Sequence, residues 1–160
     1  MNNEQYIIFI KYLRKVESPF LLKIRGYYHD DHSVTILYEN AENFTLFNLL
    51  NSKQTAKPAL ALKLKGHIAT QIAAAIQALH SHNPPFVHGH LTSSNVVLDK
   101  AFNAKLTDFG MPSLKKYASV KVGYSIMDAS IAPEYLADRP KYLHIIDPAA
   151  DIYAFGFLLW

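Results

Sequence analysis

The stretch His88-Gly89-His90-Leu91-Thr92-Ser93-Ser94-Asn95 is the most informative part of this chain of 160 residues for predicting its fold. Three further motifs follow it: Asp108-Phe109-Gly110, Ala132-Pro133-Glu134 and Asp151-Ile152-Tyr153-Ala154-Phe155-Gly156. A single short match arises easily by chance, whereas four motifs in one order are far more specific. The set therefore carries the fold prediction.

The four motifs resemble the signature of protein kinases. That signature runs His-Arg-Asp-Leu-x-x-x-Asn, then Asp-Phe-Gly, then Ala-Pro-Glu. The fourth motif resembles the start of the central helix of the kinase large lobe. The resemblance implies an α+β, protein kinase-like fold that is partial. It contains the C helix and strands 4 and 5 of the small lobe, then the large lobe up to the start of its central helix.

The resemblance covers the whole chain as one partial kinase-like domain. Residues 1–39 would be a small-lobe remnant and residues 40–160 the large-lobe part. The glycine-rich loop, the strand-three Lys and the C-terminal helices of the family are absent from the sequence. We therefore expect a fragment of a longer product, in which the missing helices would cover the apolar residues 155–160.

Composition limits the classes of function. Lys and Arg number 16 and Asp and Glu 13, and the resulting net charge of +3 is too small and scattered to indicate nucleic-acid binding. The chain has no Cys, which excludes disulfides and zinc–thiolate sites. No apolar run reaches the ~18 residues of a membrane span, and the first residues lack the basic region of a signal peptide. We expect a cytoplasmic protein with protein partners.

The spacing of apolar residues predicts the elements around the motifs. The expected elements are a helix over 4–16, strands over 21–28 and 33–38, a short helix over 45–50 capped by Thr45, a long amphipathic helix over 60–80, and short strands at 96–98 and 104–106. Their order is that of a kinase from its C helix to the activation segment.

Asn95 and Asp108 are the candidate metal ligands. Their side chains offer hard oxygen atoms, which suit magnesium. The resemblance implies that Asp108 would coordinate the magnesium that bridges the phosphates of ATP and that Asn95 would hold a second ion. The alternative is that both side chains only make local hydrogen bonds in turns.

His90 stands where the family has its catalytic Asp. The loss of a positioned base typically costs ~10²–10⁴ in rate. An imidazole could accept a proton, but it is bulkier than a carboxylate. Gly89 and Thr92 replace an Arg and a Lys of the family motif, so three positions of one loop have changed. We expect the domain to be catalytically inactive.

The resemblance also assigns positions around the cleft. Tyr38, Glu39 and Ala41 fall in the hinge, where the carbonyl of Glu39 and the amide of Ala41 would meet the adenine edge, and the bulk of Tyr38 would narrow the pocket behind it. The expected structural residues are Leu13, Ile24, His88 and Phe109, which stack between the lobes, Asp151, which anchors the loop backbone, and Glu134 of the third motif.

The C helix has an apolar residue where the family has the Glu that pairs with the strand-three Lys. Counting back seven residues from Val16, the expected end of the helix, leads to Phe9. The alternative is that the helix is shifted and Glu4 is the equivalent carboxylate.

Within the kinase family, the chain resembles the tyrosine-kinase-like group, and in particular the pseudokinases of mixed-lineage kinase domain-like proteins and the kinase homology domains of receptor guanylate cyclases. This resemblance implies a regulatory or scaffolding pseudokinase that retains ATP or metal binding. Two alternatives stay open. One is an atypical active kinase in the full-length protein, with phosphotransfer to Ser, Thr or Tyr; the other is a truncated product without function.

Overall fold

The computed structural model describes residues 3–30, 33–41, 44–51, 62–110, 130–134 and 147–160. Its elements are α1 (Asn3–Leu13), β1 (Ile24–His29), β2 (Val34–Tyr38), α2 (Leu46–Asn51), α3 (Leu62–His80), the 3-10 turn η1 (Ser93–Asn95), β3 (Val96–Leu98), β4 (Ala104–Leu106) and α7 (Pro148–Leu159). The expected α+β class is confirmed.

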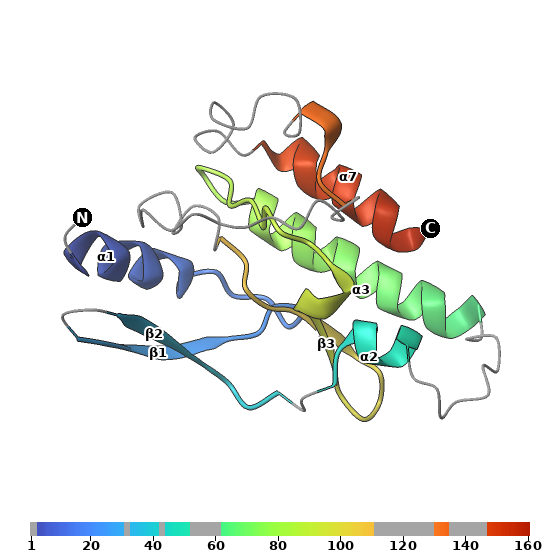
Figure 1. Ribbon diagram of the computed structural model, residues 1–160, viewed down its shortest axis with the longest axis horizontal. Helices are drawn as coiled ribbons and strands as arrows, with labels where there is room; N and C mark the ends of the chain where they lie inside the picture. Colours follow the sequence, from blue (N-terminus) through green and yellow to red (C-terminus); the bar gives the residue numbers. More distant parts are fainter. Residues whose placement is uncertain (1–2, 31–32, 42–43, 52–61, 111–129, 135–146) are drawn as a thin grey trace.

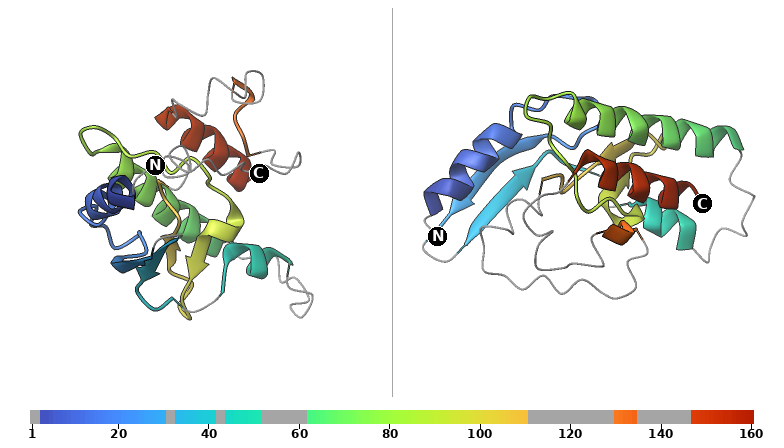
Figure 2. Two further views of the ribbon diagram at one scale, coloured as in Figure 1. Left: turned by 60° about the vertical axis from the view of Figure 1, so that its left-hand side comes forward. Right: turned by 90° about the horizontal axis from the view of Figure 1, so that it is seen from above.

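The elements form two groups in space. Helix α1 packs against the β1–β2 hairpin, and α3 lies between α7 and the β3–β4 pair (Figure 1). Seen from above, the α1–hairpin group lies beside one end of α3 (Figure 2), and in Figure 1 α2 and α7 lie on opposite sides of α3. The loop that contains residues 88–95 runs between the end of α3 and β3.

Both sheets are antiparallel pairs. In the first, β1 pairs with β2 from His29↔Val34 to Ile24↔Tyr38, with an irregularity between Ile24 and Gly26. In the second, β3 pairs with β4 from Val96↔Leu106 to Leu98↔Ala104. The second pair places residues 95 and 107 side by side, because the 3-10 turn precedes β3 and Thr107 follows β4.

Strand β4 also pairs with the segment before β1. The amide of Leu22 donates to the carbonyl of Leu106 (2.8 Å), and the amide of Leu106 donates to the carbonyl of Phe20 (2.9 Å). This pairing explains why β1 begins at Ile24 and not at residue 21 as expected: Leu21 and Leu22 are extended, but they join β4 and not β2.

Helix α1 ends at Leu13 and not at Val16. The amide of Arg14 still bonds the carbonyl of Ile10 (3.0 Å), but the amides of Lys15 and Val16 bond carbonyls only three residues back, those of Tyr12 and Leu13. The tighter turn carries Val16, which is 8% exposed, into the core. The prediction placed the end of the helix about one turn too late, because Val16 is apolar and stands at helical spacing from Leu13.

Helix α2 begins with a reciprocal cap, as expected from Thr45. The Thr45 hydroxyl accepts from the amide of Asn48 (3.2 Å), and the Asn48 side-chain oxygen accepts from the amide of Thr45 (2.9 Å). This is the arrangement of a capping box, with Asn in the place of Glu or Gln. Helix α7 begins three residues before the expected Asp151, because Asp147 caps it and Pro148 suits its first turn.

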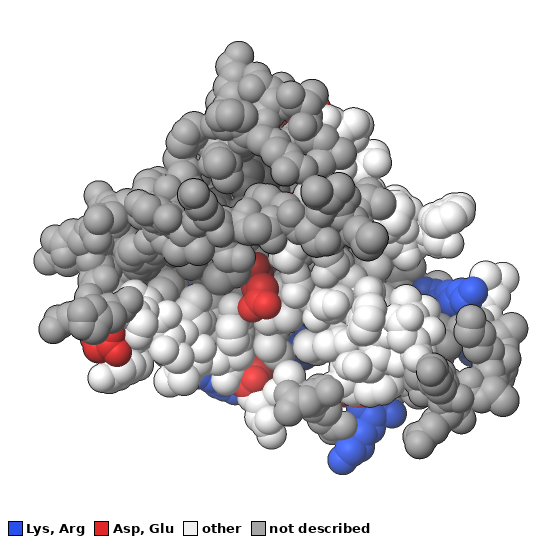
Figure 3. All heavy atoms as spheres, in the orientation of Figure 1, with Lys and Arg blue, Asp and Glu red and all other residues white. Residues whose placement is uncertain are grey.

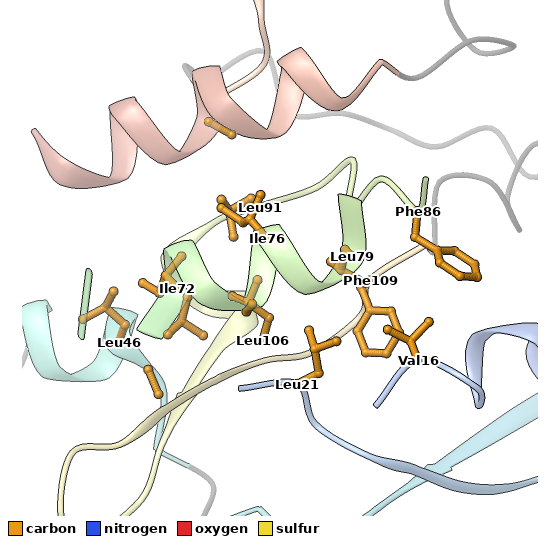
Figure 4. Close-up of a cluster of buried hydrophobic side chains, with 14 of the residues drawn as sticks. Val16, Leu21, Leu46, Ile72, Ile76, Leu79, Phe86, Leu91, Leu106 and Phe109 are labelled. Carbon is orange, nitrogen blue, oxygen red and sulfur yellow. The ribbon is translucent and has the colours of Figure 1, made fainter. Parts of the chain in front are cut away.

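The core lies around the inner face of α3. Its members include Leu13, Ile72, Leu79, Leu106 and Phe109, each at most 2% exposed. Figure 4 shows Phe109 among Leu79, Leu21 and Val16, between α3 and the segment after α1. Phe109 therefore belongs to the core that joins the two groups of elements.

The outer face of α7 is apolar and exposed. Its exposed apolar residues are Ile152, Tyr153, Phe157, Leu159 and Trp160. The inner side contacts α3, and Ala154 is buried there.

Candidate functional site

Asp151 holds the start of the 88–95 loop from α7. Its Oδ2 accepts hydrogen bonds from the His88 amide and from His80 Nε2, both at 2.8 Å, and its Oδ1 accepts from the Gly89 amide, also at 2.8 Å. The side chain is 1% exposed. A buried carboxylate is stable only when such donors compensate its lost hydration. Gly89 has φ +73°, a conformation that favours glycine.

Both ring nitrogens of His88 bond to the backbone. Nε2 faces the carbonyl of Thr107 at 3.0 Å and therefore carries a proton, while Nδ1 accepts from the amide of His90 at 3.3 Å. The imidazole is fully buried, and burial lowers its pKa from the ordinary 6.5. His88 is thus a neutral imidazole in one tautomer, which links residues 90 and 107.

Asn95 and His90 face each other within the loop. The Asn95 amide nitrogen donates to the His90 carbonyl at 2.7 Å and lies 3.4 Å from His90 Nδ1. Because a carbonyl can only accept, the short contact fixes which end of the amide faces His90. Two backbone hydrogen bonds hold Asn95 itself. Its backbone amide donates to the carbonyl of Thr92, and its backbone carbonyl accepts from the amide of Thr107, both at 3.0 Å.

Asp108 follows Thr107 and so lies next to Asn95. Its backbone has φ +59°, a left-handed conformation that Asp adopts more readily than most residues. The hydroxyl of Tyr38 lies near its carboxylate. Burial, followed by the negative charge and hydrogen bonding of Asp108, raises the pKa of Tyr38. The structure therefore brings Tyr38, Asn95 and Asp108 together, with His90 against Asn95.

Some polar atoms of this cluster are available to a ligand. Within the described residues, no hydrogen bond reaches Nε2 of His90 or Oδ1 of Asn95. No buried side-chain nitrogen or oxygen of the described part lacks a partner. Asn95 is 9% exposed and His90 is partly buried, so only a small part of this cluster is open to a ligand. The cluster offers one acceptor from Asn95, the carboxylate of Asp108 and one ring nitrogen of His90.

The side chain of Glu39 turns toward the strands. Its carboxylate pairs with Lys105 Nζ on β4 at 2.6 Å and with Arg25 on β1 at 3.7 Å. The bond from Lys105 is the main reason that the pKa of Glu39 is lowered. The amide of Glu39 donates to the carbonyl of Lys23 at 2.8 Å, and Ala41 is partly buried. The Glu39 carbonyl and the Ala41 amide thus remain the hinge groups proposed from the sequence.

The four residues expected to stack between the lobes are all buried: Leu13, Ile24, His88 and Phe109 are 1%, 4%, 0% and 2% exposed. Side chains of helix α1 also pack against Gly110, the residue after Phe109. A Cβ placed on this glycine, which has φ +72°, would lie 2.9 Å from Leu13 Cδ2 and 3.5 Å from the ring of Phe9.

Phe9 therefore lies beside the Asp108-Phe109-Gly110 turn, where it presents an aromatic ring. The count that led to Phe9 began from a helix end at Val16, which the structure moves to Leu13. The placement of Phe9 beside this turn therefore rests on its closeness to Gly110 and not on counting residues back from the end of the helix. The side chain of Glu4 lies outside the described residues.

Glu134, the remaining predicted position, and one hollow of the surface add no contact to the cluster among the described residues. Glu134 is exposed, whereas Ala132 of the same motif is buried. A hollow of about 320 Å³ is lined by Val16, Glu17, Ser18, Pro19, Leu21 and Lys23 and includes no candidate residue. Among the described residues, no three His, Asp or Glu side chains gather as a metal site. Acidic and basic side chains are scattered over the face in Figure 3.

The geometry agrees with comparisons with known proteins. The sequence profile of the protein kinase domain matches residues 1–160. The chain belongs to the protein kinase family. Its α+β fold is thus a partial protein kinase fold, as expected. Members of this family typically bind ATP and magnesium.

Individual kinases match over nearly the whole chain. Wall-associated receptor kinase-like 21 of Arabidopsis thaliana is 32% identical over 98% of the chain and 25% of its own length. A PTI1-like tyrosine-protein kinase of Arabidopsis thaliana is 30% identical over 96% of the chain and 42% of its own length. Receptor-like cytoplasmic kinase 176 of Oryza sativa subsp. japonica is 29% identical over 98% and 39%, respectively. The chain thus spans less than half the length of these relatives. The described helices include none that is long and apolar enough to cross a membrane.

Sequence reasoning missed two residues that hold this kinase site. His80 was not recognised as a partner of Asp151, and Lys105 was not recognised as a partner of Glu39. Each contact joins residues more than 60 positions apart, so local spacing carried no signal for it. For Lys105, the sequence offers one clue: it is a basic residue on a predicted strand, and Glu39 is an acidic residue that needs a partner.

Proposed function

We propose that this chain is part of a pseudokinase of the tyrosine-kinase-like group. In this proposal residues 1–39 belong to the small lobe and residues 40–160 to the large lobe. The domain binds ATP with magnesium, does not transfer phosphate, and acts in the cytoplasm as a regulatory or scaffolding module for protein partners. One observation carries the proposal: the base position holds His90, whose Nδ1 already faces an amide donor.

The described residues fit a magnesium-bound nucleotide. Asn95 Oδ1 and the Asp108 carboxylate would be the oxygen ligands; they lie on adjacent segments, which the bond from the Thr107 amide to the Asn95 carbonyl joins. When bound, magnesium would neutralise phosphate charge and orient the phosphates. The Glu39 carbonyl and the Ala41 amide would meet the adenine edge. These residues support binding, and the buried Asp151 keeps the loop in place beneath them.

Transfer to a hydroxyl needs an acceptor at the base position. The amide of Asn95 occupies Nδ1 of His90, so in the neutral ring the proton resides on Nε2. Neither nitrogen then accepts a proton from an incoming hydroxyl. The loop therefore lacks the base at position 90 but keeps the hydrogen bonds from Asp151 that hold its backbone.

Nucleotide binding is tested by thermal unfolding of the chain with ATP alone and with magnesium or manganese. A ligand at 100 times its Kd adds roughly 2.7 kcal/mol to the free energy of unfolding. We expect a metal-dependent shift that Asp108→Ala abolishes and Glu17→Ala, which removes an exposed carboxylate, retains. No shift under any of these conditions would contradict nucleotide binding and leave a protein-interaction scaffold.

The second candidate is an atypical active kinase in a longer protein. Its support is the names of the relatives, which are kinases. Transfer of radiolabelled phosphate from ATP to a protein substrate by the unmodified chain would favour this candidate. Transfer only after His90→Asp would favour the pseudokinase.

A further inference from the structure

We infer that His90 is a hydrogen-bond donor to the terminal phosphoryl group of a bound nucleoside triphosphate, which makes this site selective for a triphosphate over a diphosphate. The inference rests on the proposed nucleotide site. It changes the role of position 90 from a proton acceptor to a group that holds an anion.

The first step is the orientation of Asn95. The contact of 2.7 Å to the His90 carbonyl requires an N–H, so the amide nitrogen is at this end of the side chain. Its second N–H is then the group 3.4 Å from His90 Nδ1. A protonated Nδ1 would place two N–H groups against each other. Nδ1 is therefore the acceptor, and the proton of the neutral ring is on Nε2.

The second step is the access of Nε2. Among the described residues it has no hydrogen-bond partner, and His90 is only partly buried. The ring cannot turn over without losing its contact with Asn95. Position 90 therefore presents an N–H donor at Nε2, whereas an Asp there would present only acceptors and a negative charge.

The third step is the chemistry next to this donor. Asn95 Oδ1 and Asp108 offer oxygen atoms suited to a cation, and His90 Nε2–H offers a donor suited to an anion. A metal-bound phosphate satisfies both, because its oxygens coordinate the metal and accept hydrogen bonds. In the family, position 90 holds the Asp that accepts the proton of the hydroxyl attacking the terminal phosphate, so the terminal phosphate is the one that would meet Nε2.

The test measures binding of ATP, ADP and inorganic phosphate by isothermal titration calorimetry, each with magnesium, to the whole chain. His90→Asp removes the donor, and we expect it to weaken ATP by about 10- to 100-fold, as for loss of a hydrogen bond to a charged group. ADP should change little. His90→Gln can still accept from Asn95 and donate outward, so it should retain the preference for ATP. His67→Gln is the matched control, since His67 is exposed on α3.

The outcomes separate the two proposals. If no nucleotide binds to the unmodified chain, the proposed function fails and the inference fails with it. If ATP and ADP bind equally, or if His90→Asp weakens both equally, only the inference is overturned. Binding of inorganic phosphate as tight as ATP would assign the donor to a free anion and would also overturn it.

A second measurement needs neither ligand nor variant. Nitrogen-15 NMR of the histidine side chains distinguishes protonated from unprotonated ring nitrogens. We expect His90 to show an unprotonated Nδ1 and a protonated Nε2. The reverse tautomer would overturn the inference even if a variant failed to fold.

Discussion

The two sides of the 88–95 loop differ in how completely their polar groups are bonded. On the buried side, Asp151 receives three hydrogen bonds, and both nitrogens of His88 bond to backbone groups. On the open side, no described residue bonds Nε2 of the partly buried His90 or Oδ1 of Asn95. The hydrogen bonds of the buried side stabilise the fold, whereas the open side keeps polar atoms that a ligand could bond.

This difference indicates where sequence change is tolerated. A buried polar group that loses its partner costs about 1–3 kcal/mol, whereas an exposed one is compensated by water. The loop departs from the family pattern at residues 89, 90 and 92, yet the backbone anchors remain bonded. Four substitutions test how far the bonded and unbonded parts of the site differ.

The largest effect is expected from Asp151→Ala. It leaves the amides of His88 and Gly89 and the ring of His80 without their acceptor. Loss of one member of such a buried network costs about 3–5 kcal/mol, which we expect in urea unfolding or as failure to fold. Asp147→Ala is the control on the same helix and should cost about 1 kcal/mol as a lost N-cap. Equal losses would contradict the special role of Asp151.

The next effect concerns the packing of α1 on Gly110. In Gly110→Ala, the new methyl group would meet Leu13 Cδ2 at 2.9 Å in a left-handed backbone. Left-handed conformation alone costs roughly 1–2 kcal/mol in a residue with Cβ, so we expect about 1–3 kcal/mol of destabilisation. Gly66→Ala in α3, with nothing within 4 Å of the new methyl group, should stabilise by about 0.5–1 kcal/mol. Thermal unfolding of both variants measures the contrast.

The third prediction is a pH dependence caused by His88. Burial lowers its pKa below 6.5 in the folded chain, so the unfolded chain binds a proton first as pH falls. The contribution of His88 is constant above about pH 7 and decreases by up to about 1.4 kcal/mol per pH unit below 6.5, until the folded state is also protonated. Urea unfolding between pH 5 and 8 should show a slope that His88→Gln reduces and His67→Gln does not. Equal slopes in all three proteins would exclude His88 as its source.

The smallest effect is expected at the open side. In His90→Asp, the carboxylate could accept from Asn95 in place of Nδ1, and no described residue bonds the lost Nε2. Surface changes of this kind usually alter stability within ±0.5 kcal/mol. Differential scanning calorimetry without ligand measures the change. A loss comparable to that of Asp151→Ala would show that the two sides of the loop do not differ in the way described.

Local sequence signals predicted most of the fold. The strands at 96–98 and 104–106 were located at their observed bounds, and Thr45 was recognised as the cap of α2. Apolar spacing gave α3 within two residues of its start. These signals are short-range, because capping, turns and helical spacing depend on residues within one or two turns.

The remaining features depended on long-range contacts. The end of α1 was misplaced because burial of Val16 arises from the chain after the helix, not from the helix itself. The first strand was extended too far because Leu21 and Leu22 pair with β4. At the site, the motifs gave the positions of Asn95, Asp108 and His90, but only geometry shows which atoms of Asn95 and His90 face each other.

The two backbone bonds between β4 and residues 20–22 give this molecule a natural reporter of its own opening. The amides of Leu22 and Leu106 can exchange with deuterated water only when the segment before β1 separates from β4. Leu106 is also fully buried, so its exchange rate should follow the largest opening motions of the chain. A ligand that clamps the α1–hairpin group onto the α3 group would slow both amides together, and a ligand that binds only one group would leave them unchanged.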